Sequence, residues 1–341
     1  MLHWSQIRGQ ERPLDILKTA LNTGRVHHAY LFTGLQGVGK FLTAQTFAAV
    51  VNCAHRPEGE FRDACGECSS CRKIDGRQHP DVLFVEPEKG RIKIAQIREI
   101  QKAAMKAPYE GRFRIVLIDD AHTMTEEAAN ALLKTLEEPS KRMRLILVTD
   151  QPHGLLDTII SRCQVLRFGA LEESDVVELL DELLEENEDI ERPDAKLLEV
   201  AAGYGEGSVG RTFAVVESGM LDARREFVEQ IVNLPAGQPV PLLDLAEELS
   251  SNKNELERKL DVLKLFLRDV MLYKAAGNAD RLINTDLVDL VASYSDRVSL
   301  DELLGLLDEI REAQRLLMRN VHAQLITENL LGNFRRHGAS A

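Results

Sequence analysis

The sequence lacks any continuous apolar stretch of about 18 residues, the length that a membrane-spanning helix needs. Its first ten residues are polar and contain no apolar core of the kind found in secretory signal peptides. Cysteine is scarce, at five residues in 341, and an odd number disfavours a framework of disulfide bonds. We therefore expect a cytoplasmic protein whose thiols stay reduced.

Positive charge is also in deficit, because 42 lysine and arginine residues face 55 aspartate and glutamate residues. The resulting net charge of −13 disfavours non-specific binding to nucleic acid, so any such contact would need a local basic patch or an assembly. With 44% hydrophobic and 28% charged residues, the composition is that of a globular protein, and the length predicts two or three domains.

Residues 1–168 alternate between short apolar runs and longer amphipathic stretches. Strands that alternate with helices favour an α/β fold with a parallel sheet, here of five strands, covered on both faces. One helix is expected to begin at a capping box formed by Thr123 and Glu126 and to end before Pro139. The five predicted strands are Tyr30–Thr33, Val82–Glu86, Phe113–Ile118, Arg144–Val148 and Gln164–Phe168.

Beyond residue 168 the pattern becomes helical. Residues 172–194 hold twelve acidic residues and one basic residue, yet their leucines form an apolar helical face. This acidic helix and two more predict a small three-helix domain over residues 169–220, followed by an all-α domain over 221–335 and a frayed tail over 336–341. The other predicted helices are 195–203, 211–217, 256–273, 282–294 and 300–317, with a linker or loop at 233–241.

A phosphate-binding loop follows the first predicted strand. Gly34, Gly37, Gly39 and Lys40 lie in a segment that fits G-x-x-x-x-G-K. Glycines let backbone N–H groups turn toward phosphate oxygens, and the lysine reaches the outer phosphates of a nucleotide such as ATP. A chance glycine turn is the alternative, but the order of strand, loop and helix favours a P-loop.

Several positions depart from the pattern of an active P-loop ATPase. Phe41 stands where a hydroxyl would bind Mg²⁺, and Thr43 lies about 200° further around the helix. Asp119 ends a buried strand and could hold Mg²⁺, whereas Asp120 stands where a longer glutamate usually orients water. An acidic pair that caps the next helix is the alternative. These departures predict weak hydrolysis and leave nucleotide binding open.

Four cysteines within residues 53–71 indicate a structural zinc site. Cys65, Cys68 and Cys71 are each separated by two residues, and Cys53 precedes this group by a further eleven. Four thiolates complete a tetrahedral Zn²⁺ site, and a metal would explain how a spacer with few apolar residues folds. Unrelated thiols and an iron–sulfur site are the alternatives. His55 and His79 are reserve ligands should Cys53 not be used.

Further motifs resemble the clamp-loader subunits of bacterial DNA polymerase III, which are AAA+ proteins. The resemblance is dense over residues 1–168 and includes a zinc module between the P-loop helix and the second strand. Beyond that region, the chain matches mainly in its helical layout. The motifs are Ile7–Gln10, His28–Phe32 leading into the P-loop, Ala128–Pro139 and Ser161–Cys163, with a weaker echo at Gly207–Arg211.

Within that family, the chain is similar to the delta-prime branch rather than to the gamma/tau ATPase branch. Phe41 and Asp120 depart from the ATPase pattern, and Gly210 stands where that branch usually has a nucleotide-sensing arginine, with Arg211 one place on. The segment 90–98 also resembles delta-prime, and no long extension of the tau kind follows the helices. An active gamma/tau-type motor is the second reading, and a P-loop phosphotransferase is the third.

The resemblance implies a stator of DNA polymerase III holoenzyme, itself a nucleotidyltransferase, at the nucleoid-associated replisome. Residues 169–220 would form a lid, and residues 221–335 a collar that assembles with gamma/tau and delta subunits. The assembly would load the sliding clamp onto primed DNA. We expect the chain to hydrolyse little ATP alone and to complete a neighbour's ATPase site.

The resemblance also assigns that role to Arg162, as an arginine finger that acts in trans. A planar guanidinium suits a neighbour's γ-phosphate, and a local salt bridge is the alternative. Three other residues receive smaller roles: Cys163 is expected to be a small buried residue, Thr149 a phosphate-sensing candidate, and Trp4 a packing residue.

Overall fold

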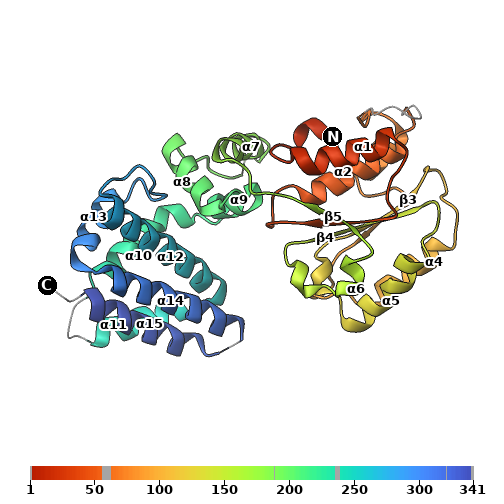
Figure 1. Ribbon diagram of the computed structural model, residues 1–341. Coiled ribbons are helices and arrows are strands. Elements are labelled where there is room, and N and C mark those ends of the chain that lie inside the picture. The colour runs from red at the N-terminus through yellow and green to blue at the C-terminus, as the bar shows by residue number, and fades with distance from the viewer. Residues whose placement is uncertain (1, 56–62, 188, 235–238, 320, 339–341) are drawn as a thin grey trace. The chain divides into compact units, whose positions relative to one another are not determined.

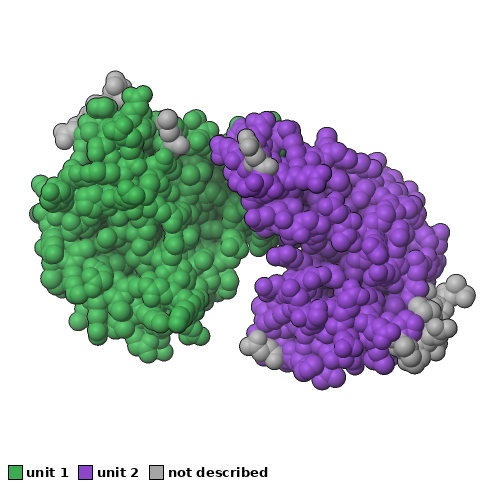
Figure 2. All heavy atoms as spheres, turned by 180° about the vertical axis from the view of Figure 1, so that it is seen from behind, with its two compact units in different colours: residues 1–179, 207–211 green, residues 180–206, 212–341 purple. Residues whose placement is uncertain are grey.

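The computed structural model describes residues 2–55, 63–187, 189–234, 239–319 and 321–338, which Figure 1 traces as a ribbon. The chain forms two compact units, coloured separately in Figure 2. Unit 1 contains residues 1–179 and 207–211, and unit 2 contains residues 180–206 and 212–341. Among the described residues, unit 1 is an α/β structure and unit 2 is helical.

Unit 1 is built on a parallel sheet of five strands, which confirms the predicted fold class. Its strand order is β2-β3-β4-β1-β5, and all neighbouring strands run parallel. Each predicted boundary agrees with the structure to within one residue, because buried parallel strands give continuous apolar runs. The strands are β1 (Ala29–Thr33), β2 (Val82–Val85), β3 (Arg114–Ile118), β4 (Met143–Thr149) and β5 (Gln164–Arg167).

Helices cover both faces of this sheet. Figure 1 shows α1 and α2 on one side, with α4, α5 and α6 on the other. Alternate side chains of β1 point to opposite faces of the sheet. Tyr30 packs against Phe47 of α2, whereas Leu31 packs in the hydrophobic core between the sheet and helices α4 and α5. The helices are α1 (Glu11–Asn22), α2 (Lys40–Asn52), α3 (Ser69–Asp75), α4 (Ile94–Ala104), α5 (Glu126–Glu137) and α6 (Asp157–Ile160), with 3₁₀ turns at η1 (Trp4–Gln6), η2 (Ala121–Thr123) and η3 (Pro152–Gly154).

The start of α5 differs from the predicted capping box. Thr125 caps the helix, and its hydroxyl accepts the N–H of Ala128 at 3.3 Å. Thr123 instead belongs to η2 and donates its hydroxyl to the carbonyl of Asp120 at 2.8 Å, so it is not available to cap α5. The helix ends at Glu137, before Pro139, as predicted.

The helices after the sheet pack around a second hydrophobic core in unit 2. The acidic helix predicted within residues 172–194 is confirmed as α7, and the boundary between the units falls inside it. The helices are α7 (Glu173–Glu185), α8 (Ala195–Gly205), α9 (Val209–Glu217), α10 (Met220–Val232), α11 (Pro239–Ser250), α12 (Lys253–Ala276), α13 (Val288–Arg297), α14 (Leu300–Met318) and α15 (Ala323–Gly338).

Three predicted features of this region need correction. Helix α13 begins at Val288 rather than at residue 282, because the amides of Ile283 and Asn284 turn to the buried carboxylate of Asp269. The predicted linker 233–241 is shorter, since α11 already begins at Pro239, a position that proline favours. Helix α15 continues to Gly338, so residues 336–338 are helical rather than frayed, and residues 339–341 lie outside the described ranges.

The two compact units divide the chain differently from the three predicted domains. Residues 207–211 belong to unit 1, whereas the rest of the segment 180–220 belongs to unit 2. The division into a domain at 1–168, a lid at 169–220 and a collar at 221–335 therefore stays a prediction. Within the described ranges, every helix is too short or too polar to span a lipid bilayer.

Candidate functional site

The P-loop begins directly after β1 and leads into α2. Gly34 has a φ of +148°, and a Cβ there would lie 2.3 Å from the carbonyl oxygen of Phe168. Gly39 has a φ of +90° and is the residue before α2, whose first residue is Lys40. Position 34 requires glycine because the backbone of Phe168 lies so close, and positions 34 and 39 both favour glycine because their φ angles are positive. These glycines bring the backbone to the N-terminus of α2, where phosphates bind in P-loop proteins.

Residues 207–211 pack directly on this loop. The hydroxyl of Ser208 donates to the carbonyl of Gln36 at 2.6 Å, and the N–H of Gly210 donates to the carbonyl of Gly37 at 3.2 Å. A Cβ on Gly210 would lie 2.9 Å from the Cα of Gly37. A glycine at position 210 therefore allows the two backbones to touch.

Lys40 turns back onto the loop that precedes it. Its ammonium group is buried and donates to the carbonyls of Gly34 at 2.8 Å and Leu35 at 2.5 Å. Burial lowers the pKa of Lys40, the carboxylates of nearby aspartates oppose this shift, and the charge of Arg211 adds to it. The two loop carbonyls thus occupy two of the three N–H donors of the ammonium group.

Aspartates from the carboxyl ends of β3 and β4 share a pocket of about 250 Å³ with Lys40. Burial raises the pKa of Asp119, and the charge of Asp120 raises it further. Asp120 adopts a left-handed conformation, with a φ of +42°, and its side chain does not cap η2. The structure thus brings both predicted acidic residues, together with Asp150, to the predicted P-loop pocket.

Phe41 also lines the pocket and packs on the side of β2. The centroid of its ring lies 6.2 Å from that of Phe84, and the guanidinium of Arg77 lies 4.9 Å from the same ring. The hydroxyl of Thr43 donates to the carbonyl of Gly39 at 2.7 Å, as a helical i−4 bond. Phe41 therefore provides no hydroxyl at the metal position, and Thr43 does not replace it.

Thr149 is buried at the carboxyl end of β4. Its hydroxyl oxygen accepts the N–H of Gln151 at 3.0 Å and lies 3.1 Å from Nδ1 of His122. The hydroxyl is thus held by protein groups at the sheet edge that carries the P-loop. Its role as a phosphate sensor stays a prediction.

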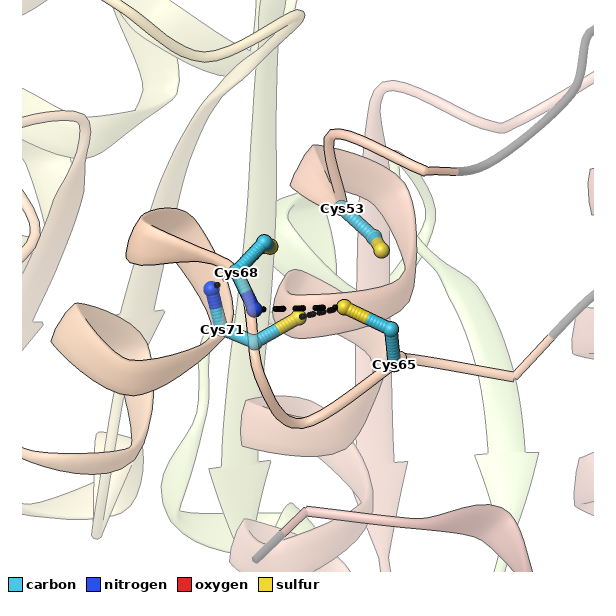
Figure 3. Close-up of side chains that lie close together, drawn as sticks. All are labelled: Cys53, Cys65, Cys68 and Cys71. Atoms are coloured by element: carbon cyan, nitrogen blue, oxygen red, sulfur yellow. Dashed lines mark hydrogen bonds between the residues drawn. The ribbon is translucent and has the colours of Figure 1, made fainter.

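The four clustered cysteines come together as a possible metal site (Figure 3). Their sulfur atoms all lie within 4.8 Å of one another, and the Sγ atoms of Cys65 and Cys71 are 3.9 Å apart. A tetrahedral ion with Zn–S bonds of about 2.3 Å needs sulfurs about 3.8 Å apart. Cys53 ends α2 and Cys68 caps α3, so the cluster joins two packed helices. The chemistry and spacing of the donors fit zinc.

Backbone amides point at two of these sulfurs. The N–H of Cys68 donates to the sulfur of Cys65 at 3.3 Å, and that of Cys71 donates to the sulfur of Cys68 at 3.4 Å. Burial alone would raise the pKa of Cys68, but backbone N–H groups of Cys71 and Ala54 outweigh it and lower that pKa to about 6. Such N–H groups favour the thiolate form that binds metals.

The reserve histidine ligands lie outside the cysteine cluster. His79 is buried, and its ring nitrogens meet the hydroxyl of Ser70 at 3.1 Å and the N–H of Asp81 at 3.1 Å. His55 is exposed on the turn after α2. The four-cysteine set is therefore the one that the structure assembles, as predicted.

Arg162 lies between α6 and β5, where two acceptors hold its guanidinium. Nη1 donates to the carbonyl of Thr158 at 2.9 Å, and Nη2 pairs with Oε1 of Glu137 at 2.8 Å. The side chain of Arg162 is 36% exposed and lines a hollow with His27 and His28. Arg162 thus makes a local salt bridge, the alternative to the finger role, yet its side chain remains accessible.

Arg162 and the P-loop lie at opposite edges of the same sheet. Arg162 precedes β5, whose first residue pairs with Tyr30 near the amino end of β1. The P-loop follows Thr33, at the carboxyl end of β1. Three residues of extended strand separate these points by about 10 Å, before the loop and the helix that follows add to it. Arg162 therefore lies away from the chain's own P-loop pocket.

Comparisons with known proteins identify the family of this arrangement. Models of the DNA polymerase III delta subunit and of its C-terminal region match residues 9–172 and 218–336. Subunit delta' of DNA polymerase III from Bacillus subtilis is 32% identical over 97% of this chain and 98% of its own length. The chain belongs to the delta-prime family of DNA polymerase III clamp-loader subunits. This assignment confirms the predicted branch.

Related clamp-loader proteins include gamma and tau subunits. DNA polymerase III subunit tau of Escherichia coli is 33% identical over 69% of this chain, which spans 36% of that protein. The delta-prime family is thus related to tau, as the shared motifs indicate. A solved gamma subunit-related protein from Thermotoga maritima is 19% identical with a TM-score of 0.43, covering 96% of this chain and 99% of its own.

Sequence reasoning missed some residues that the structure adds to these sites. Asp150 and His122 lie at the P-loop edge, and Glu137 pairs with Arg162. Asp150 follows a predicted strand, which was an available signal, and Glu137 lies in the recognised motif 128–139. Smaller expectations hold: Trp4 is buried, and Cys163 is partly buried against the core, where burial raises its pKa to about 12.

Proposed function

We propose that this chain is a stator that supplies Arg162 to the ATP site of a neighbouring clamp-loader subunit. The observation that carries the proposal is the placement of Arg162 at the sheet edge opposite the chain's own P-loop. A guanidinium that cannot serve its own pocket, yet remains accessible, suits a site that a second subunit completes. The family assignment supports a neighbour with a P-loop of the gamma/tau type.

The chemistry expected of Arg162 is electrostatic. As the γ-phosphoryl group is transferred to water, negative charge spreads over its oxygens and the leaving group. A planar, permanently charged guanidinium stabilises that charge through two directed N–H bonds, which a lysine ammonium group does not reproduce. The chain would thus raise the hydrolysis rate of its neighbour without reacting itself.

We propose that the chain's own pocket hydrolyses little or no ATP. Phe41 provides no hydroxyl for Mg²⁺, Asp120 is shorter than the usual glutamate, and Lys40 is bound to loop carbonyls. Gly34, Gly37 and Gly39 all have positive φ angles, and they leave binding of a nucleotide as a separate question from its hydrolysis.

The wider role follows from the family. We propose that the chain assembles with gamma/tau and delta subunits and helps to load the sliding clamp onto primed DNA at the nucleoid-associated replisome in the cytoplasm. In this role it serves DNA polymerase III holoenzyme, a nucleotidyltransferase, but transfers no nucleotide itself. The relationship to tau proteins over most of this chain supports the shared assembly.

We also propose that Cys53, Cys65, Cys68 and Cys71 hold one structural Zn²⁺. Four sulfurs within 4.8 Å of one another provide a closed coordination set. The ion would fix the end of α2 to the start of α3. A closed four-thiolate set leaves no position for substrate, so the role is structural.

The test of the stator role is Arg162→Ala in a reconstituted complex with gamma/tau and delta subunits. Arginine fingers contribute about 10³–10⁵ in rate, and a complex with several ATP sites shows a smaller effect on its total turnover. We expect DNA- and clamp-stimulated ATP hydrolysis to fall and Arg162→Lys to restore little of it. The exposed Arg142→Ala, which also removes one positive charge, should leave turnover unchanged. Unchanged turnover with Arg162→Ala at equal incorporation would contradict the proposal.

A further inference from the structure

The guanidinium of Arg162 is occupied within its own chain. Nη2 pairs with the carboxylate of Glu137 at 2.8 Å, while Nη1 donates to the carbonyl of Thr158 at 2.9 Å. The guanidinium has five N–H donors, so a phosphate has to displace one of these acceptors only where it approaches from the same side. Of the two acceptors, only the carboxylate is charged, so it competes more strongly than the carbonyl with a phosphate for the guanidinium.

Glu137 lies at a helix end where an acidic side chain is disfavoured. It is the last residue of α5, where the free backbone carbonyls already give a partial negative charge. Glu138 follows directly, so two carboxylates lie at this helix end, and acidic residues are disfavoured there. Arg162 approaches from the segment between α6 and β5 and neutralises one of the two carboxylates.

The pair is strong enough to position Arg162 and weak enough to be exchanged. The side chains of Arg162 and Glu137 are 36% and 49% exposed, so water screens their attraction. Exposed pairs of this kind shift an equilibrium by up to about five-fold. A terminal phosphate group carries more charge than a carboxylate, and its oxygens can accept from both ends of the guanidinium fork.

We propose that Glu137 is a positioning residue that holds Arg162 in a charge-neutral pair and releases it when a neighbour's ATP phosphate arrives. This inference rests on the proposed trans role of Arg162. Glu137 offsets the positive charge of the guanidinium and occupies one of its N–H groups, so it lowers engagement of the finger when the subunits are loosely associated. Its removal should therefore raise the turnover of the complex most where clamp and DNA are absent.

The experiment is a steady-state ATPase assay on the reconstituted complex with Glu137→Gln, which removes the charge and keeps the shape. We expect turnover without clamp and DNA to rise about two- to five-fold, in line with the strength of the pair. Glu137→Asp keeps the charge, so it should stay closer to the unmodified chain. Glu138→Gln is the matched control, because it makes the same change at the next exposed position and should have no such effect.

A double variant shows whether Glu137 acts through Arg162. In an Arg162→Ala background, Glu137→Gln should change nothing, because the group that it positions is absent. If Arg162→Ala alone leaves turnover unchanged, the trans role is lost and this inference with it. Suppose instead that Arg162→Ala lowers turnover. The positioning role is then refuted, and the trans role stands, if Glu137→Gln has no more effect than Glu138→Gln or if it lowers turnover.

Discussion

Asp81 is the most densely bonded carboxylate of unit 1, within the described residues, and a test of its role follows directly. It precedes β2 and has no exposed side-chain surface. Its oxygens accept backbone N–H groups from Tyr109, Glu110 and Gly111 at 2.7 to 2.9 Å, and pair with Nη2 of Arg114 at 2.8 Å. One side chain thus fixes the loop before β3 to the start of β2.

The expected cost of Asp81→Asn can be worked from its pKa. Burial alone would raise that pKa, but the three backbone N–H groups and Arg114 outweigh it and lower it from 3.8 to about 2. A shift of this size corresponds to about 2.4 kcal/mol in favour of the charged form. The amide of asparagine also turns N–H donors toward the same backbone groups. We therefore expect the free energy of unfolding to fall by about 2–4 kcal/mol.

The assay is equilibrium unfolding in urea, followed by tryptophan fluorescence. Trp4 is the one tryptophan of the sequence, and it is buried in unit 1, which also contains Asp81. Its fluorescence therefore follows the unit in which the change is made. Asp15→Asn, at an exposed position on α1, is the matched control and should alter the free energy of unfolding by less than about 0.5 kcal/mol.

The pH dependence gives the reasoning a second check. A carboxylate whose pKa is lowered on folding stabilises the folded state above its ordinary pKa of 3.8, and this contribution disappears as pH falls toward about 2. The difference between Asp81 and Asp81→Asn proteins should thus stay constant from about pH 8 to about pH 5 and narrow below about pH 4. A difference under about 1 kcal/mol at neutral pH would refute the assignment of Asp81 as a charged anchor.

Two further predictions concern the metal and the P-loop. Elemental analysis should find about one zinc per chain. The Cys68→Ser variant should lose most of this zinc, whereas Cys163→Ser, which lies outside the cluster, should retain it. Metal-free protein with four freely reactive thiols would contradict the site. The isolated chain should hydrolyse ATP no faster than its Lys40→Ala variant. Phe41→Thr combined with Asp120→Glu should raise turnover. Robust, Lys40-dependent turnover by the unmodified chain would favour a gamma/tau-type motor instead.

The strands of the sheet could be predicted where burial produces a continuous apolar run in the sequence. Residues of β1 and β3 are buried on both faces, so their apolar runs have no polar alternation to blur the boundaries. The start of α5 was less predictable, because Thr123 and Thr125 are both able to cap a helix. A local hydrogen bond distinguishes them, since the hydroxyl of Thr123 is bound to Asp120 within the 3₁₀ turn, whereas that of Thr125 accepts the N–H of Ala128.

Long-range contacts account for what the sequence did not predict. Residues 282–287 have the apolar spacing of a helix, but the carboxylate of Asp269 draws the amides of Ile283 and Asn284, 14 and 15 positions further along the chain, into a turn. Likewise, Glu137 and Arg162 are separated by 25 positions and meet because the end of α5 and the start of β5 lie at one edge of the sheet. The sequence motifs contain both Glu137 and Arg162, but their spacing does not predict that the two side chains form an ion pair.

The two edges of the sheet explain how one function can weaken while another is kept. All five strands run parallel, so loops at the carboxyl edge carry the P-loop, Asp119 and Asp150, whereas the segment before β5 carries Arg162 at the amino edge. Changes such as Phe41 and Asp120 alter groups at the carboxyl edge and leave the contacts of Arg162 with its acceptors on α5 and α6 untouched. The proposed weak ATP hydrolysis is therefore compatible with the proposed role of Arg162 at a neighbouring subunit.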